Sequence, residues 1–171
     1  LTDITQQKLA QEALRSQKER LSNIIEATHL GTWEWNIQTG EVIFNEQWAT
    51  LLGYSLDEIS PASINTWLDL YHPDDLGKAQ KLAEKHFKGQ TTYFHIEARM
   101  RHKEGRWIWV LDKGKVISSS KHREPLWMFG TTKDITERKE MEETIIQERN
   151  LSNALIERAA GVYYLFDSNL R

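Results

Sequence analysis

The stretch GTTKDITERKE, residues 130–140, decides how the chain is divided, because a second version of it, LTDITQQKL, stands at residues 1–9. In both copies Asp-Ile-Thr leads into a polar segment rich in Gln, Glu, Lys and Arg with scattered Leu, Ile or Met. A Gln or Glu follows each Asp at the spacing of a helix-capping pair, although Thr136 could equally be the cap. Each polar segment therefore predicts a helix that begins close to Asp-Ile-Thr.

A second pair of similar segments supports this division. LSNIIEATHLGTWEWN from Leu21 resembles LSNALIERAAGVYYLFD from Leu151, at almost the separation of Asp3 and Asp134, which are 131 residues apart. A repeat of this length indicates whole domains rather than the short units of a solenoid. We therefore expect four parts in chain order: the end of a preceding unit with a linker helix at 1–21, a complete domain at 22–136, a linker helix at 137–160, and the first strand of a following unit at 161–171.

The composition excludes several classes of function. The absence of Cys rules out disulfides, thiolate zinc sites and chemistry through a cysteine sulfur. The net charge is only −3, and Lys and Arg are spread along the chain, so we expect no nucleic-acid partner. No apolar run approaches the about 18 residues of a membrane span, and the start pairs no basic segment with an apolar run, so we expect neither a span nor a signal peptide in this segment. We expect this segment to be cytoplasmic without direct membrane contact, while a longer parent protein could be anchored elsewhere.

Local patterns outline the complete domain. Residues 31–37 alternate apolar and polar side chains, residues 38–40 form a turn, and residues 42–44 follow as a second strand, which predicts a hairpin. A short helix is expected between a cap at Asn45 and a stop at Gly53. A longer helix is expected to open at His72-Pro73-Asp74-Asp75, because Pro suits the first turn and both carboxylates face its positive end.

Three further strands complete the predicted sheet. Residues 93–101 alternate, which predicts a half-buried strand, and residues 107–111 are apolar on both faces. Residues 126–132 supply the last strand. A strand with two apolar faces needs covering on both sides, so we expect the domain's own helices on one side and a flanking helix or a second chain on the other.

These fragments together resemble one known family. GTWEWN at 31–36, the segment from Asn45 to Tyr54, HPDD at 72–75, GRW at 105–107 and the stretch from Gly130 to Thr136 resemble, in order and spacing, the Trp-rich subtype of the PAS family with its C-terminal PAC motif. The resemblance implies an α+β fold with a five-stranded antiparallel sheet and short helices on one face. It also implies linker helices at both ends of the domain.

The resemblance further implies a function. It points to a sensory or relay module of a bacterial multi-domain signal-transduction protein, such as a two-component sensor histidine kinase or a cyclic-di-GMP enzyme, for example a diguanylate cyclase. The segment is then a regulatory module and not itself an enzyme, and Asp134, Ile135 and Thr136 pass a conformational signal to the helix after them. The alternative is a constitutive dimerisation or spacer module without a ligand. Expected partners are a second copy, through the flanking helices and the sheet face, and the adjacent PAS and output domains.

Any small-molecule ligand is expected between the sheet and the helices. The residues expected around such a pocket are Trp48, Leu52, Leu82, Phe87, Ile96, Ala98 and Met100. No cofactor is expected, although flavin or haem held without a covalent bond stays open. The preferred reading of the aromatics is that Trp33, Trp48, Trp67 and Trp107 belong to the core.

Five polar positions have competing interpretations. His86, near the end of the long helix, could ligate a haem iron, but we expect a surface or helix-terminal role. His95 and Glu97 could begin a metal site, but two ligands are too few and cross-strand ion pairs are favoured. We expect no metal and no catalytic residue, since Asp74 and Asp75 are explained by the helix start.

Overall fold

The computed structural model describes residues 2–119 and 124–168, with the side chains of residues 2–5, 119 and 159–168 left aside. The chain divides into two compact units, Leu1–Asp134 and Ile135–Arg171, and each is described by itself. No helix among the described residues has the length and apolar character needed to cross a membrane.

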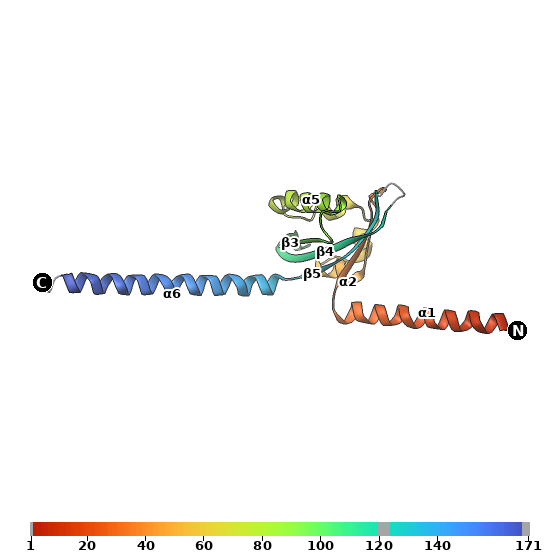
Figure 1. Ribbon diagram of the computed structural model, residues 1–171, viewed down its shortest axis with the longest axis horizontal. Coiled ribbons are helices and arrows are strands. Elements are labelled where there is room, and N and C mark those ends of the chain that lie inside the picture. The colour runs from red at the N-terminus through yellow and green to blue at the C-terminus, as the bar shows by residue number, and fades with distance from the viewer. Residues whose placement is uncertain (1, 120–123, 169–171) are drawn as a thin grey trace. The chain divides into compact units, whose positions relative to one another are not determined.

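The first unit is an antiparallel sheet of five strands with helices on one face (Figure 1). The strands stand in the spatial order β2-β1-β5-β4-β3, and the predicted α+β architecture is confirmed. Its elements, in chain order, are α1 (Thr2–Ala27), β1 (Gly31–Asn36), β2 (Val42–Phe44), α2 (Glu46–Leu51), α3 (Leu56–Ile59), α4 (Ile64–Leu68), α5 (Pro73–Phe87), β3 (Phe94–Arg101), β4 (Trp107–Ser119) and β5 (Pro125–Asp134). The second unit contains α6 (Thr136–Ser168).

The predicted cap at Asn45 also joins α2 to the sheet. Its Oδ1 accepts hydrogen bonds from the backbone N–H of Trp48 at 2.9 Å and of Thr32 at 2.8 Å, and its Nδ2 donates to the carbonyl of Leu30 at 3.1 Å. One side chain thus satisfies an orphan donor of the helix and holds the start of β1 beside it. The helix ends as predicted before Gly53, whose φ of +81° favours glycine.

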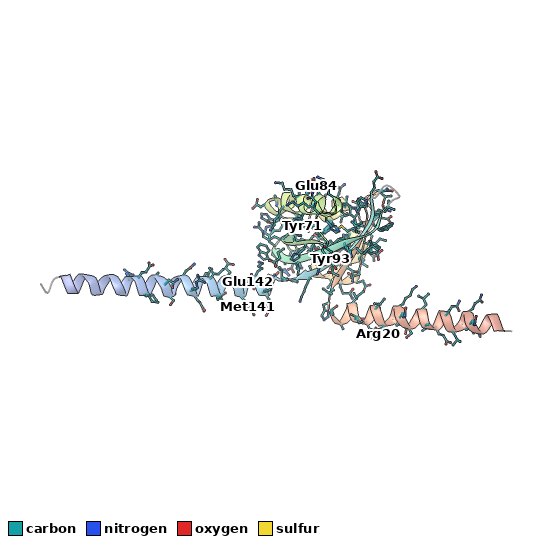
Figure 2. All side chains as sticks on the ribbon, in the orientation of Figure 1. Arg20, Tyr71, Glu84, Tyr93, Met141 and Glu142 are labelled. Atoms are coloured by element: carbon teal, nitrogen blue, oxygen red, sulfur yellow. The ribbon has the colours of Figure 1, made fainter. Side chains whose placement is uncertain are left out.

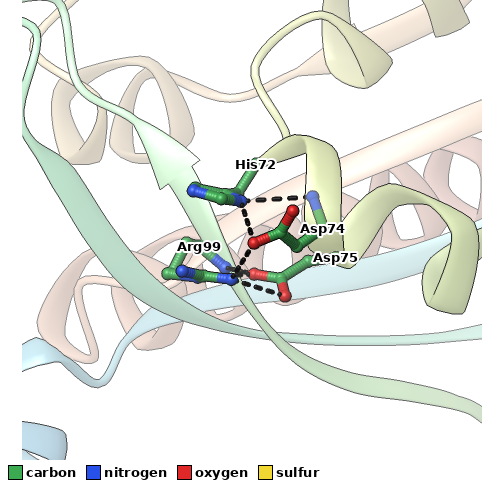
Figure 3. Close-up of polar contacts among 4 residues, drawn as sticks. All are labelled: His72, Asp74, Asp75 and Arg99. Atoms are coloured by element: carbon green, nitrogen blue, oxygen red, sulfur yellow. Dashed lines mark hydrogen bonds and ion pairs between the residues drawn. The ribbon is translucent and has the colours of Figure 1, made fainter.

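Hydrogen bonds and ion pairs among His72, Asp74, Asp75 and Arg99 fix the start of α5 to β3 (Figure 3). His72 caps the helix, and its Nδ1 accepts from the backbone N–H of Asp74 at 3.2 Å. Asp75 accepts three hydrogen bonds from Arg99, from the backbone N–H and Nε at 2.9 Å each and from Nη2 at 3.0 Å. The hydrogen bonds from the guanidinium lower the pKa of Asp75. The helix-start interpretation of these carboxylates is therefore correct but incomplete, because Asp75 also anchors the helix to the sheet.

The centre of the inner sheet face is built around Trp33. Its β1 position pairs with Gly130 on β5, which in turn pairs with Gly114 on β4. A Cβ at either glycine would overlap the Trp33 ring. The bare backbone of this glycine pair therefore makes the room in which the indole lies across the strands, and only 1% of Trp33 is exposed.

Trp107 corrects one expectation about the core. Trp33, Trp48 and Trp67 are buried as predicted, but Trp107 is 41% exposed. Side chains alternate along β4, and the inner positions belong to Ile108 and Val110, so Trp107 projects from the outer face. Its ring packs 4.5 Å from that of His72.

Residues 161–168 also differ from their expected conformation. They continue α6 instead of forming a strand, and residues 169–171 lie outside the described part of the chain. A strand satisfies its backbone by pairing with another strand, and within the described residues none pairs with this segment. Helical hydrogen bonds, which need no partner segment, are made instead. The assignment of 161–171 to a following unit stays a prediction.

The glycine pair under Trp33 gives a direct test. We expect Gly130→Ala to lower the free energy of unfolding by at least about 2 kcal/mol, because the added methyl group must displace the indole or the backbone. The matched control is Gly77→Ala in α5, where a Cβ meets nothing within 4 Å. That change should stabilise by about 0.5–1 kcal/mol through helix propensity. Urea unfolding followed by Trp fluorescence measures both, and equal effects would contradict this account of the core.

Candidate functional site

A cavity of about 460 Å³ lies between the helices α4 and α5 and the inner face of the sheet. Much of its wall is aromatic, and the rings pack on one another. The centroid of the Trp35 ring lies 5.6 Å from that of Phe87 and 6.5 Å from that of Trp67. The lining residues are Trp35, Ile64, Trp67, Leu68, Tyr71, Ala79, Gln80, Ala83, Glu84, Phe87, Phe94 and Met128. A concave, mainly apolar site of this size is suited to a small molecule.

The cavity shares one residue, Phe87, with the seven predicted around a pocket. Trp48, Leu52, Ala98 and Met100 have no exposed surface, and Ile96 is 2% exposed. Leu82 is partly buried against the same core. These residues belong to the packed interior, whereas the cavity lies beside β1 and is lined by Trp35, Trp67 and residues of α5. Whether a ligand contacts the seven predicted residues stays a prediction.

A buried hydrogen-bond network starts at the cavity wall. The Tyr71 hydroxyl donates to Oδ2 of Asp112 on β4, and the Thr132 hydroxyl on β5 donates to Oδ1 of the same carboxyl. The Trp48 indole N–H donates to Oγ1 of Thr132 at 3.1 Å. Asp112 and Thr132 have no exposed surface. We call Tyr71, Asp112, Thr132 and Trp48 the Asp112 network; Figure 2 labels Tyr71 between α5 and the sheet.

Burial controls the ionisation of this network. Loss of hydration raises the pKa of Asp112 to about 6, against the opposing effect of the hydrogen bonds from Thr132 and Tyr71. Burial, together with the nearby Asp112 carboxyl, raises the pKa of Tyr71 well above its usual value. Tyr71 therefore remains a protonated donor, and Asp112 is the member that can titrate near neutral pH.

Sequence reasoning did not single out Asp112, although one signal was present. The residue interrupts the apolar run WIWVLDKGKV at a position with the same parity as Ile108 and Val110. Strand alternation therefore assigns it to the inner face, and a carboxyl there requires buried donors. Its donors, Tyr71 and Thr132, are 41 and 20 residues away, so the local pattern could not name them.

His86 lies in the last turn of α5, as the helix-terminal interpretation expected, but it is not a surface residue. The side chain is buried, and both of its ring nitrogens contact the backbone: Nδ1 lies 2.9 Å from the carbonyl oxygen of Thr91, and Nε2 accepts from the N–H of Val116 at 3.0 Å. It thus ties the end of α5 to β4. A haem iron could bind Nε2 only after this bond to Val116 was broken.

The other polar candidates lie apart from the cavity. His95 is exposed and Glu97 half-buried on β3, and the described residues contain no group of three His, Cys, Asp or Glu placed to hold a metal ion. Asp134 is the last residue of β5, Ile135 is buried, and Thr136 is the first residue of α6. Their part in signal transmission stays a prediction.

A five-stranded antiparallel sheet with helices and a cavity on one face defines a sensor-type α+β domain, and the comparison with known families agrees. Residues 41–132 match the PAS fold family. This chain belongs to the PAS family.

Relatives of the chain are signalling proteins. The methyl sulfide methyltransferase-associated sensor of Methanosarcina acetivorans is 29% identical over 153 residues, which cover 89% of this chain and 15% of that protein. The hybrid signal transduction histidine kinase A of Dictyostelium discoideum is 34% identical over 96 residues, or 55% of this chain and 4% of that protein. The chain thus spans a small part of the length of these relatives.

Solved structures show the same fold. A sensory box histidine kinase/response regulator from Burkholderia thailandensis superposes with a TM-score of 0.69 at 23% identity, covering 78% of this chain and 98% of that one. The N-terminal domain of a diguanylate cyclase with a PAS/PAC sensor from Marinobacter aquaeolei gives a TM-score of 0.56 at 22% identity, covering 64% and 98%.

The raised pKa of Asp112 predicts a pH-dependent stability. Because its folded pKa of about 6 exceeds its usual value of 3.8, its contribution is fully present below about pH 3.8 and is lost as the pH rises through about 6. Between about pH 7.5 and about pH 5, the wild type should gain about 1 kcal/mol relative to Asp112→Asn, which cannot titrate. Urea unfolding of both proteins at the two pH values measures this gain. The same difference between the proteins at both values would contradict titration of Asp112.

Proposed function

We propose that this chain is a sensory PAS module of a larger signal-transduction protein, in which the state of the cavity is passed to α6. Membership of the PAS family and similarity to the sensor modules of histidine kinases and diguanylate cyclases support this proposal. The chain regulates and the chemistry belongs to an output domain, a histidine kinase or a diguanylate cyclase, elsewhere in the parent protein.

The observation that carries the proposal is that Tyr71 belongs both to the cavity wall and to the Asp112 network. Its side chain lines the cavity, and its hydroxyl donates to Asp112, which also accepts from Thr132 on β5. A ligand that moves Tyr71 would therefore change the hydrogen bonds that hold β5. Thr132 stands two residues before Asp134, the end of β5, and only Ile135 separates that strand from α6.

The energies of the network suit a switch. A hydrogen bond to a charged acceptor contributes about 1.5–3 kcal/mol, and shifting a two-state equilibrium from one side to the other takes about 5 kcal/mol. Rearranging two such bonds at Asp112 would supply much of that difference. In this mechanism Asp134, Ile135 and Thr136 connect the displaced strand to the first turn of α6.

Hydrogen exchange tests this route. We expect Tyr71→Phe to speed amide exchange at the end of β5, at residues 132–134, by about tenfold, because Asp112 loses one donor and Thr132 is held less firmly. The matched control is Tyr54→Phe, since Tyr54 is half-buried beside the core and lies outside the Asp112 network. Mass spectrometry of peptides after timed exchange measures both.

Two results would count against the route. Equal acceleration throughout the sheet would mean that Tyr71→Phe only lowers global stability. No acceleration at residues 132–134 would mean that the Asp112 network does not hold β5. Repeating the exchange with Asp112→Asn and with the double variant separates these cases, because residues of one network give non-additive effects.

A specific observation favours the second candidate function, a constitutive dimerisation or spacer module. The outer sheet face exposes large apolar side chains, with Trp107 41%, Ile117 63% and Phe129 38% exposed. Leu14 and Leu21 of α1 and Ile145 of α6 are exposed as well. Such surfaces commonly bind another protein surface, and a second copy would cover the sheet faces without any ligand.

The oligomeric state tests this candidate. We expect the wild-type chain to sediment as a dimer and Ile117→Glu with Phe129→Glu to sediment as a monomer, since two buried carboxylates would oppose pairing of the sheet faces. Lys81→Glu, an exposed change on α5, is the charge control. A monomeric wild type would exclude constitutive dimerisation by this chain, and a dimer unchanged by the double variant would place the pairing on the helices.

A further inference from the structure

The one charged side chain among the described residues that line the cavity is acidic. Among the described residues that line it, none is Lys, Arg or His, and Glu84 is the only one with a carboxylate. Glu84 stands on α5 one turn after Gln80, the lining amide. Figure 2 labels Glu84 on α5.

A second carboxyl lies behind the wall. Asp112 is joined to the hydroxyl of the wall residue Tyr71 and has no exposed surface. The Lys88 ammonium lies 3.9 Å from the Glu84 carboxylate, and both side chains are 66% exposed. An exposed pair of this kind is weak and screened by salt, so Glu84 stays available to a ligand. The indole N–H groups of Trp35 and Trp67 are buried without a hydrogen-bond partner among the described residues, and as neutral donors they suit an uncharged acceptor atom of a ligand and supply no counter-charge to an anion.

The aromatic rings in the cavity wall also favour a cation over an anion. The faces of Trp and Tyr rings attract cations, and Trp35, Trp67 and Tyr71 all border the cavity. An anion placed there would lose hydration and meet carboxylates instead of a counter-charge, which is costly. The cavity volume of about 460 Å³ is within the range for small organic ligands.

We propose that the cavity binds a mainly apolar molecule with a positively charged amine at the end near Glu84, and that it discriminates against anions. This inference rests on the proposed sensory function and names the chemical class of the signal. Ligands with phosphate or carboxylate groups, which include flavin nucleotides and haem, are disfavoured by the same lining.

A matched set of probes tests the charge preference. Naphthylmethylamine, naphthylmethanol and naphthylacetate share an aromatic body and are cationic, neutral and anionic at neutral pH. Titration calorimetry on the complete chain should show the amine binding about tenfold more tightly than the acetate, with the alcohol between them. Glu84→Gln should reduce this preference by about threefold, whereas Lys81→Gln, an exposed change on the same helix, should leave it unchanged.

A substitution that fills the cavity tests whether the probes bind there. Ala83→Trp should abolish binding of all three probes, with circular dichroism to confirm folding and Ala83→Leu as the smaller replacement. Acetate binding as tightly as the amine, or a charge preference unaltered in Glu84→Gln, would overturn the inference on ligand class and leave a sensory cavity intact. Failure of all three probes to bind, or binding unaffected by the filled cavity, would overturn the cavity as the sensing site and so the proposed function with it.

Discussion

The contact of the Trp33 indole with the backbone of Gly114 and Gly130 is the constraint on which the rest of the inner face depends. A large ring can lie across adjacent strands only where neighbouring positions carry no side chain, and these two glycines face each other across β4 and β5. The Trp67 ring then packs against the Trp33 ring, with their centroids 4.8 Å apart. That packing sets where α4 lies over the sheet. The cavity is the volume left between α4, α5 and β1 once these rings are in place.

The Asp112 network is the polar exception within this apolar layer. A buried carboxyl with a raised pKa costs stability, and an apolar side chain of similar size at the same place could be neutral or favourable. The donors Tyr71 and Thr132 offset part of the cost and join the helical layer to β5. The proposed sensory role gives a reason for a sheet to retain such a group, because it makes the position of β5 depend on the wall of the cavity.

The two faces of the sheet suit different tasks. The inner face carries the cavity, whose described lining residues include one carboxylate, that of Glu84, and no cation. The outer face exposes Trp107, Ile117 and Phe129 and suits another protein surface. A ligand on one face and a second copy on the other would both act on β4 and β5. Dimerisation through the outer face is therefore compatible with the sensory proposal.

The sequence by itself determined the features whose signals are local. The 31–44 hairpin, the Asn45 cap, the start of α5 at His72-Pro73 and the alternation of β3 were all predicted, because caps, turns and alternation depend on residues a few positions apart. The order of these fragments also identified the family. The core position assigned to Trp107 was wrong, since the alternation of side chains along β4 places it on the outer face of the sheet.

Only the tertiary structure decided which residues share a space. Tyr71 and Asp112 are 41 residues apart, and Trp48 and Thr132 are 84 apart, so no local pattern could pair them. A cavity is the volume that packed surfaces leave unfilled, and its walls come from α4, α5, β1, β3 and β5 together. Apolar side chains that fill a core and those that line a gap are alike in sequence. For that reason Phe87 was predicted at the cavity, while Trp35 and Trp67 were found only when the chain was seen folded.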